Sequence, residues 1–275
     1  MPVDPAAKVH PTAIISAEAV VGPGVEIGPY TVFDGPVTVG PNCVIAPHVH
    51  LIGPLTMGQG NRIGTGSVFG SEPQHLAYKG QPTSTEIGDN NTFREHVTIH
   101  RGSHVEGVTR IGNNNYLMAH THVAHDCHVA NHCIMVNGSL LAGHCRLEDR
   151  VIMSGGAAIQ QFVRVGRLSM IAGHESATKD VIPFVIVGAR NVIAGVNSIG
   201  LKRAGFTTDE ILAVRKAFHL LYRSGLMLKN AIERLETEMA DVPVVAEIVR
   251  FIRTTQANKR SIVRPKTKGG VDEEE

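Results

Sequence analysis

The stretch VHPTAIISAEAVVGPGVEIGPYTVF, residues 9–33, repeats one pattern every six residues. From Val9 onward a large apolar residue returns at every sixth position as far as Ile171. Of the 28 positions at this spacing, only His75 and Gln81 are not large and apolar. Because an α-helix has 3.6 residues per turn, it cannot keep a six-residue register over this length. The repeat therefore predicts short strands joined by turns.

A second column of smaller residues stands two positions before the first and begins with Ala13 and Ala19. Residues two apart on an extended strand point to the same side, so both columns face inward. Three six-residue sides make a coil of 18 residues, and the sequence predicts a mainly β fold, a parallel β-helix. From Val9 to Ile171 we expect nine such steps, a prism roughly 45 Å long.

The repeat also divides the chain. We expect a β-helix domain over residues 1–196, with excursion loops near residues 71–86 and 101–109. A capping box from Thr207 to Glu210 and apolar residues at helical spacing predict a small C-terminal α-helical domain over residues 197–253. It would include helices at 228–240 and 244–252. The basic and acidic end, residues 254–275, is typical of a disordered tail.

Composition excludes several classes of protein. The 275 residues carry 26 Lys and Arg against 25 Asp and Glu, and only 4% are aromatic, so nothing indicates a nucleic-acid partner. No apolar run is long enough for a transmembrane segment, and the first ten residues do not resemble a secretory signal. The four cysteines (Cys43, Cys127, Cys133 and Cys145) all fall in the small inward column, so we expect buried free thiols in a cytoplasmic protein.

Histidines gather in the middle of the repeat, nine of the fifteen between His96 and His144. None occupies an inward column, so we expect them on the walls and corners rather than in the core. His125 and Asp126 share one turn with His122, and His144 lies 19 residues beyond His125. Nineteen residues is one coil plus one residue, which places the two histidines within about 6 Å of each other.

The same spacing stacks Gly143 on His125 and Gln161 on Gly143. A glycine there leaves room beside the imidazole and an exposed N–H for an oxyanion. A histidine oriented by a neighbouring carboxylate suits proton abstraction from a sugar hydroxyl.

Two other interpretations compete with catalysis. Several of these histidines could bind a metal, but metal ligands must converge, and positions 120 and 122 point differently from position 125. The polar wall could also line a subunit interface without chemistry, which the periodicity alone allows equally well.

Local strings add a family resemblance to this pattern. The strings are TIHRG at 98–102, AHDC at 124–127, LAGH at 141–144, QF at 161–162, GLKR at 200–203 and YRSG at 222–225. Together with the repeat, they make residues 8–255 resemble the acyl-carrier-protein-dependent UDP-N-acetylglucosamine 3-O-acyltransferases, hexapeptide-repeat enzymes that begin lipid A biosynthesis. The resemblance implies a left-handed β-helix and a homotrimer with sites between subunits.

The resemblance also implies roles for individual residues. His125 would be the general base for the sugar 3-hydroxyl, Asp126 would orient it, and the N–H of Gly143 would stabilise the oxyanion. The donor would be a 3-hydroxyacyl-phosphopantetheine on acyl carrier protein, with no metal or dissociable cofactor. Gly173 matches the position that limits acyl length, and a glycine there leaves room for a longer chain. Further implied substrate contacts are Gln74, His122, His144, Gln161, Asn197 and Arg203.

The chain departs from the family pattern around the acceptor. These departures keep open a hexapeptide acyltransferase that acts on a different sugar or amino-sugar nucleotide. A non-catalytic or metal-binding solenoid is the remaining alternative. The departures are His75, Ala77, Gln160, Asn191, Ile199 and Ala204. Basic residues that could dock acidic acyl carrier protein are Arg164, Arg167, Lys179, Arg190, Lys202, Arg203, Arg215 and Lys216.

Overall fold

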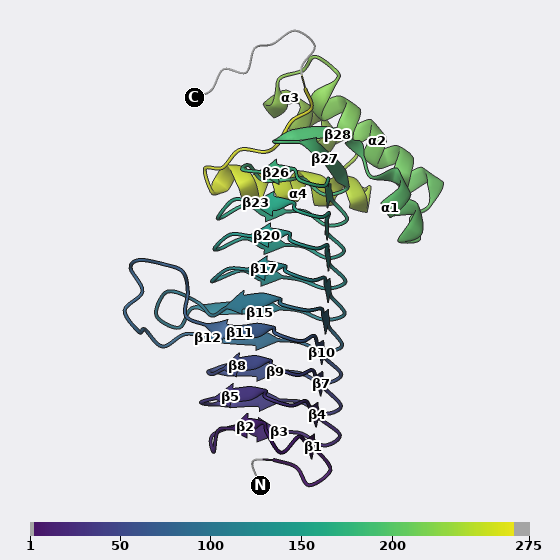
Figure 1. The fold of residues 1–275 in the computed structure, drawn as a ribbon. Helices are drawn as coiled ribbons and strands as arrows, with labels where there is room; N and C mark the ends of the chain where they lie inside the picture. The colour runs from purple at the N-terminus through teal and green to yellow at the C-terminus, as the bar shows by residue number, and fades with distance from the viewer. Residues whose placement is uncertain (1–2, 267–275) are drawn as a thin grey trace.

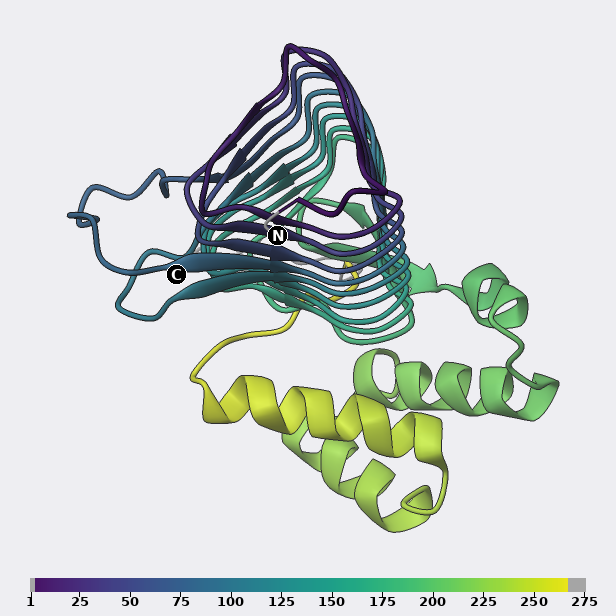
Figure 2. The ribbon, with the colours of Figure 1, turned by 90° about the horizontal axis from the view of Figure 1, so that it is seen from below.

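The structure, a computed structural model, describes residues 3–266 as a three-sided parallel coil with helices at its C-terminal end (Figure 1). Each side is one sheet, of eleven, nine and eight strands. We call them the first, second and third face, in the order in which the chain visits them. Seen from the N-terminal end, the chain turns counterclockwise as it recedes, so the coil is left-handed, as expected (Figure 2).

The strands are two to five residues long. The first face holds β1 (Lys8–Val9), β4 (Glu26–Ile27), β7 (Val44–Ile45), β10 (Arg62–Ile63), β13 (Thr92–Phe93), β16 (Tyr116–Leu117), β19 (Ile134–Met135), β22 (Ile152–Met153), β25 (Met170–Ile171), β27 (Val185–Ala189) and β28 (Val192–Val196). The second face holds β2 (Ile14–Ile15), β5 (Val32–Asp34), β8 (His50–Ile52), β11 (Val68–Ser71), β14 (Thr98–His100), β17 (His122–Val123), β20 (Leu140–Leu141), β23 (Ala158–Ile159) and β26 (Ser176–Ala177). The third face holds β3 (Val20–Val21), β6 (Val37–Val39), β9 (Leu55–Met57), β12 (Ser84–Ile87), β15 (Val108–Ile111), β18 (His128–Val129), β21 (Arg146–Leu147) and β24 (Arg164–Val165).

The two inward columns form the core of the prism. Large residues such as Phe33 and Leu51 are almost completely buried, and the small column fills the space between them. All four cysteines are free and buried, as the repeat predicts. Burial raises the pKa of the Cys133 thiol to about 12, so this thiol stays protonated at neutral pH.

The coil is one step shorter than the spacing predicts. Ile63 pairs with Phe93, 30 residues on, and Phe93 pairs with Leu117, 24 residues on, whereas other neighbouring rungs such as Ile45 and Ile63 are 18 apart. The excursion loops thus add twelve and six residues. Both lengths are multiples of six, so the insertions leave the six-residue spacing of the large apolar residues unchanged. The sequence therefore predicts nine steps where the structure has eight.

The parallel coil ends in an antiparallel hairpin, β27 with β28. Four helices follow: α1 (Ser198–Arg203), α2 (Thr208–Tyr222), α3 (Leu228–Glu238) and α4 (Pro243–Ala257). The predicted capping box is present, since Thr207 and Glu210 cap each other at the start of α2. Helix α4 runs beside the third face (Figure 2). Among the described residues, the helices are too short or too polar to cross a membrane.

The prediction of a disordered tail from residue 254 is wrong for residues 254–266. Helix α4 continues to Ala257, and the chain then returns to the coil, where Ile262 forms a bridge with Asp180. The buried carboxylate of Asp180 accepts hydrogen bonds from Thr255 and Arg260, at 2.9 Å each. These hydrogen bonds to Asp180 hold residues 254–266 against the coil. The periodicity of the sequence does not predict them. Residues 267–275, the rest of the predicted tail, lie outside the described residues.

Candidate active site

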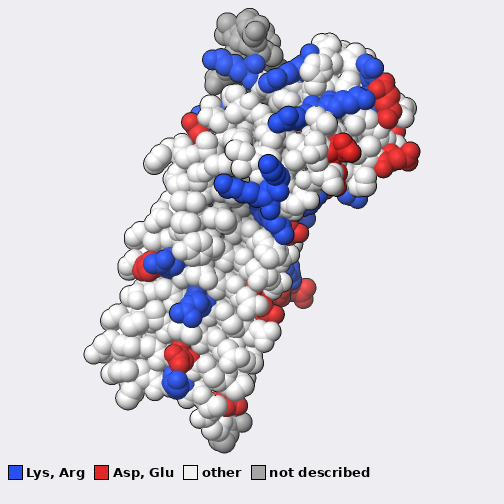
Figure 3. All heavy atoms as spheres, turned by 90° about the vertical axis from the view of Figure 1, so that its right-hand side faces the viewer, with Lys and Arg blue, Asp and Glu red and all other residues white. Residues whose placement is uncertain are grey.

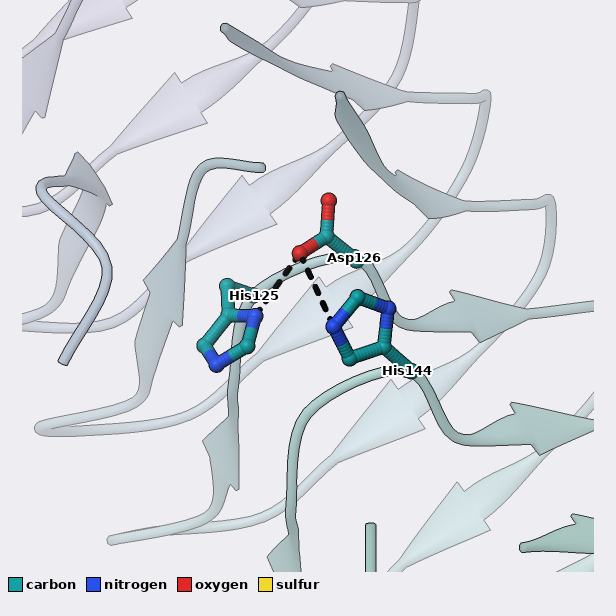
Figure 4. Close-up of side chains that lie close together, drawn as sticks. All are labelled: His125, Asp126 and His144. Carbon is teal, nitrogen blue, oxygen red and sulfur yellow. Dashed lines mark hydrogen bonds and ion pairs between the residues drawn. The ribbon is translucent and has the colours of Figure 1, made fainter. Parts of the chain in front are cut away.

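The predicted histidine cluster forms where the second face turns into the third. We call the turns at residues 125–126, 143–144 and 161–162 the histidine corner. His125 is 6% exposed, and its Nδ1 lies 2.7 Å from Oδ2 of Asp126 (Figure 4). His144 approaches the same oxygen through Nε2, at 3.6 Å. The spacing argument therefore placed these three residues together correctly.

Asp126 is held by the second excursion loop, residues 101–107. The backbone N–H of Ser103 donates to both carboxylate oxygens at 3.1 Å, and its hydroxyl donates to Oδ2 at 2.6 Å. His104 Nδ1 lies 3.1 Å from Oδ1, and the N–H of Asp126 donates to the hydroxyl of Thr109. The carboxylate thus has a fixed orientation. Burial alone would raise the pKa of Asp126, but hydrogen bonds from His125 and Ser103 outweigh it and hold the pKa well below its usual value.

This ionised carboxylate decides the tautomer of His125. Because Asp126 can only accept, Nδ1 of His125 carries the proton and Nε2 of the neutral ring is a free acceptor. The arrangement is that of a histidine general base oriented by a carboxylate.

Gly143 lies directly against the His125 ring. A Cβ at position 143 would lie 2.5 Å from Cε1 and 2.7 Å from Nε2 of His125, so only glycine fits. The expectation of an exposed backbone was wrong, because Gly143 is buried. The reason is the imidazole itself, which lies over the glycine where solvent would otherwise reach it.

The N–H of Gly143 donates no hydrogen bond within residues 3–266. The coil explains this, because at most turns the residue two positions after a large inward residue lies outside the ladder that its neighbours make. Ala142 and His144 both donate to neighbouring rungs. Proline, which has no N–H, fills the same position at five other turns. They are Pro11, Pro23, Pro29, Pro41 and Pro47. A free donor therefore lies beside the free acceptor of His125.

Neutral histidines surround the pair. Burial, and next the charge of His125, lower the pKa of His122, whose Nδ1 lies 2.7 Å from the hydroxyl of Thr98. Burial also lowers the pKa of His144, although Asp126 opposes the shift. Burial lowers the pKa of His100 to about 4. None of these histidines occupies an inward column, as predicted, but His100 and His125 are buried nonetheless.

The first excursion loop, residues 72–83, reaches the same corner. His75 places its ring edge-to-face against His125, with 5.1 Å between centroids. Arg101 holds the base of this loop through Glu72 and the hydroxyl of Tyr78, at 3.3 Å each. Both loops project from the prism on this side (Figure 2). The departure at His75 therefore lies at the centre of the site.

The other predicted contact residues are not all gathered here. Gln161 is exposed on the rung after Gly143, and Gln74 is exposed beside His75 in the first loop. Gly173 lies at a different corner, between the first and second faces, where a Cβ would meet only the carbonyl of Gly155, at 3.5 Å. The amide of Asn197 caps α1 and donates to the carbonyl of Leu168. Arg203 is exposed in the last turn of α1.

The repeat did not assign a role to some residues that contribute to the site. Ser103 and His104 hold Asp126 from a loop without periodicity, and Phe162 stacks on His144 at 4.6 Å. The string TIHRG directly precedes Ser103, and the string QF contains Phe162, so both strings could have pointed to these residues.

The same corner could hold a metal ion, since ligand atoms of His125, Asp126 and His144 lie within 4.8 Å of one another. An ion there would displace the proton that joins His125 to Asp126. The hydrogen bond of 2.7 Å between them favours a proton-transfer site instead.

Comparison with known proteins agrees with this geometry. Residues 18–53 and 108–143 match the family described as bacterial transferase hexapeptide (six repeats). Residues 180–263 match the family described as Udp N-acetylglucosamine O-acyltransferase, domain 2. The chain is therefore a hexapeptide-repeat acyltransferase.

Curated relatives and solved structures narrow the class. An acyl-[acyl-carrier-protein]--UDP-N-acetylglucosamine O-acyltransferase of Burkholderia orbicola is 46% identical, covering 94% of this chain and 99% of the relative. A relative of the same name from Xylella fastidiosa is 44% identical, covering 91% of this chain and 97% of the relative. The structure of a Francisella novicida UDP-N-acetylglucosamine acyltransferase is 36% identical with a TM-score of 0.86, covering 98% of this chain and 97% of that chain. This chain belongs to the acyl-[acyl-carrier-protein]--UDP-N-acetylglucosamine O-acyltransferase family.

Proposed function

We propose that this enzyme transfers a 3-hydroxyacyl chain from acyl carrier protein to the 3-hydroxyl of UDP-N-acetylglucosamine, the opening step of lipid A biosynthesis. The observation that carries the proposal is the pairing at one corner of a free imidazole acceptor, Nε2 of His125, with a free backbone donor, the N–H of Gly143. Acyl transfer to an alcohol needs both groups at once.

The reaction needs no other group. Nε2 of His125 takes the hydroxyl proton as the sugar oxygen bonds to the thioester carbon, and Asp126 stabilises the imidazolium that forms. The N–H of Gly143 donates to the carbonyl oxygen as it becomes negative. When the tetrahedral intermediate collapses, the carbon–sulfur bond breaks and the departing thiolate takes the proton back from His125. We assign no metal or dissociable cofactor to this sequence of steps.

The acceptor would lie over the histidine corner. His122 and His144 are neutral, so they can donate to or accept from sugar hydroxyls, while Gln74 and Gln161 border the corner. Gly173, Asn197 and Arg203 lie elsewhere on the same chain, so a neighbouring copy would have to bring them to the site. This distribution supports the homotrimer with sites between subunits.

The acyl carrier protein would dock on the helical domain. Lys and Arg side chains gather over this end of the molecule, whereas the prism on the same side carries few charges (Figure 3). Lys202, Arg203, Arg215 and Lys216 are exposed, and a pocket of about 400 Å³ between β28 and α2 is lined by Arg215, Arg223 and His219 without any acidic residue. Arg164 and Arg167 fit docking less well, because Glu148 and Glu247 neutralise them. Buried free thiols and a carrier-protein donor support a cytoplasmic location.

The test is an acyl-transfer assay with 3-hydroxyacyl carrier proteins of graded length and UDP-N-acetylglucosamine. We expect product with the wild type and a loss of activity of about 10³-fold or more in His125→Ala. His10→Ala, an exposed histidine at the far end of the coil, is the matched control and keeps wild-type activity. Equal activity in His125→Ala would overturn the assignment, and product only with an amino-sugar nucleotide would favour the alternative acceptor.

The same assay tests chain length. Gly173 has room for a side chain and no strained backbone, so Gly173→Leu should fold and shift the preferred donor to a shorter acyl chain. An unchanged length profile would remove Gly173 from the acyl site.

A further inference from the structure

A groove of about 710 Å³ lies beside the histidine corner, between the third face and the end of α4. His144 and Phe162 form one end of it, so it opens directly onto the proposed active site. Leu147 lines it on the third face, and Thr254, Asn258 and Arg260 line it from α4 and the segment after it. Thr254, Asn258 and Arg260 have no role in the reaction described above.

The third face carries a column of basic side chains that runs into the floor of the groove. Arg110, His128, Arg146 and Arg164 occupy successive strands of the third face and are directly opposite one another in register. Neighbouring strands are about 4.8 Å apart, and like charges opposite each other are destabilising. Counter-charges beside such a column reduce this repulsion.

Carboxylates neutralise the charge of every arginine in the column and across the groove except Arg146. Arg110 pairs with Glu86 at 2.8 Å, and Arg164 pairs with Glu148 at 3.1 Å. Arg260, across the groove, pairs with Asp180 at 2.9 Å. Arg146 has no ion pair within residues 3–266, although it stands between His128 and Arg164. The groove therefore has an uncompensated positive charge on its floor.

A second donor in the groove also lacks a partner. The guanidinium of Arg164 lies 4.3 Å from the centroid of the Phe251 ring, which fixes its plane. Its Nη2 donates to Glu148, but its Nη1 is buried and has no hydrogen-bond partner among the described residues. An unpaired buried donor is costly, and an anion with several acceptor oxygens would satisfy it.

We infer that this groove binds a phosphate ester, with Arg146 and Arg164 as its ligands. The inference rests on the proposed function for the identity of that ester, because both proposed substrates carry one. It is either the diphosphate of the sugar nucleotide or the phosphodiester of the phosphopantetheine arm. In both cases the groove would hold the charged part of a substrate while its reacting group lies at His125.

Titration calorimetry on the full chain tests the inference with three probes: inorganic pyrophosphate, UDP and 4′-phosphopantetheine. Arg146→Gln should weaken pyrophosphate and one of the other two probes about tenfold, and that probe identifies the substrate. Arg146→Lys keeps the charge and should retain most of the affinity. Arg110→Gln is the matched control, since it removes an arginine from the same column outside the groove and should change each affinity less than twofold.

Three results would overturn the inference: a wild type that binds no probe, an Arg146→Gln variant that binds all three normally, or equal weakening by Arg110→Gln. Failure of the proposed function looks different. If the wild type forms no product but Arg146→Gln still weakens the binding of pyrophosphate, the groove is a phosphate site and the proposed substrates are wrong. If the wild type forms product and Arg146→Gln changes neither binding nor either KM, the groove is wrong and the proposed function stands.

Discussion

The histidine corner and the corner where the third face meets the first use the same backbone in opposite ways. In both, there are turns at which the residue two positions after a large inward residue has an N–H that the strand ladder does not use. At three successive turns of the third-to-first corner, a side chain of the next rung accepts this N–H. Asn113 accepts from the N–H of Asp89, Asn131 from that of Asn113, and Asp149 from that of Asn131, at 2.7–2.8 Å.

At the histidine corner no side chain among residues 3–266 accepts the N–H of Gly143, which stays free beside an imidazole. The first-to-second corner has a third solution, proline, at its first three turns. They are Pro11, Pro29 and Pro47. The comparison teaches that the coil leaves a backbone donor outside the ladder at many of its turns, and that a site arises where the sequence leaves that donor unsatisfied beside a base.

Loss of the carboxylate should have the largest effect. Asp126→Asn keeps the size of the side chain but removes the acceptor that holds the proton on Nδ1 of His125, so kcat should fall by about 10³-fold to 10⁴-fold. Steady-state assays measure kcat, and thermal melting of the same preparation checks the fold. Activity within tenfold of the wild type would mean that the carboxylate does not set the tautomer.

Gly143→Ala should cost about 10²-fold to 10³-fold in activity. The new Cβ would lie 2.5 Å from Cε1 of His125 and force the ring away from both the N–H and the substrate. Single-turnover acyl transfer measures the chemical step directly. A variant with normal activity would show that the free N–H is not an oxyanion donor. The free N–H would then give the histidine corner no functional difference from the third-to-first corner.

Acid should destabilise the molecule through His100, which ends β14 and packs against His122. Burial depresses the folded pKa of His100 to about 4, below its unfolded value of 6.5. Below pH 6.5 the unfolded chain binds a proton that the folded chain does not, so stability is complete above that pH and falls toward pH 4. The loss at pH 4.5 should be on the order of 2 kcal/mol.

Urea denaturation at pH 7 and at pH 4.5 measures this loss, and His100→Gln should reduce it. His10→Gln, an exposed histidine at the N-terminal end, serves as the control and should retain the wild-type loss. If both variants lose as much as the wild type, the acid sensitivity arises elsewhere.

Asn131→Ala should have the smallest effect and the opposite character. It removes the acceptor for the N–H of Asn113 and a donor to Asp149, so the free energy of unfolding should fall by about 1–2 kcal/mol. Activity should stay within twofold, because this corner holds none of the proposed catalytic groups. A large loss of activity with unchanged stability would contradict the division between the two corners.

Periodicity predicted the stacking of the site but not its surroundings. The 18-residue coil correctly placed Gly143 against His125 and His144 beside Asp126, because regular strands carry positions forward with a fixed rise. It did not predict Ser103 or His75, since both lie on loops whose conformation depends on contacts such as that of Arg101 with Glu72. It also miscounted the rungs, because insertions of twelve and six residues leave a six-residue register unchanged.

By itself the sequence determined the coil, its inward columns and the pairing of His125 with Asp126. The physical reason is that a repeat which buries one large and one small residue on each side leaves no other way to cover its apolar surface. Only the tertiary structure decided which turn N–H stays free, which carboxylate faces which arginine, and where residues 254–266 lie. These depend on side chains from distant rungs, loops and helices that meet only after the coil has formed, as Asp180 meets Thr255 and Arg260.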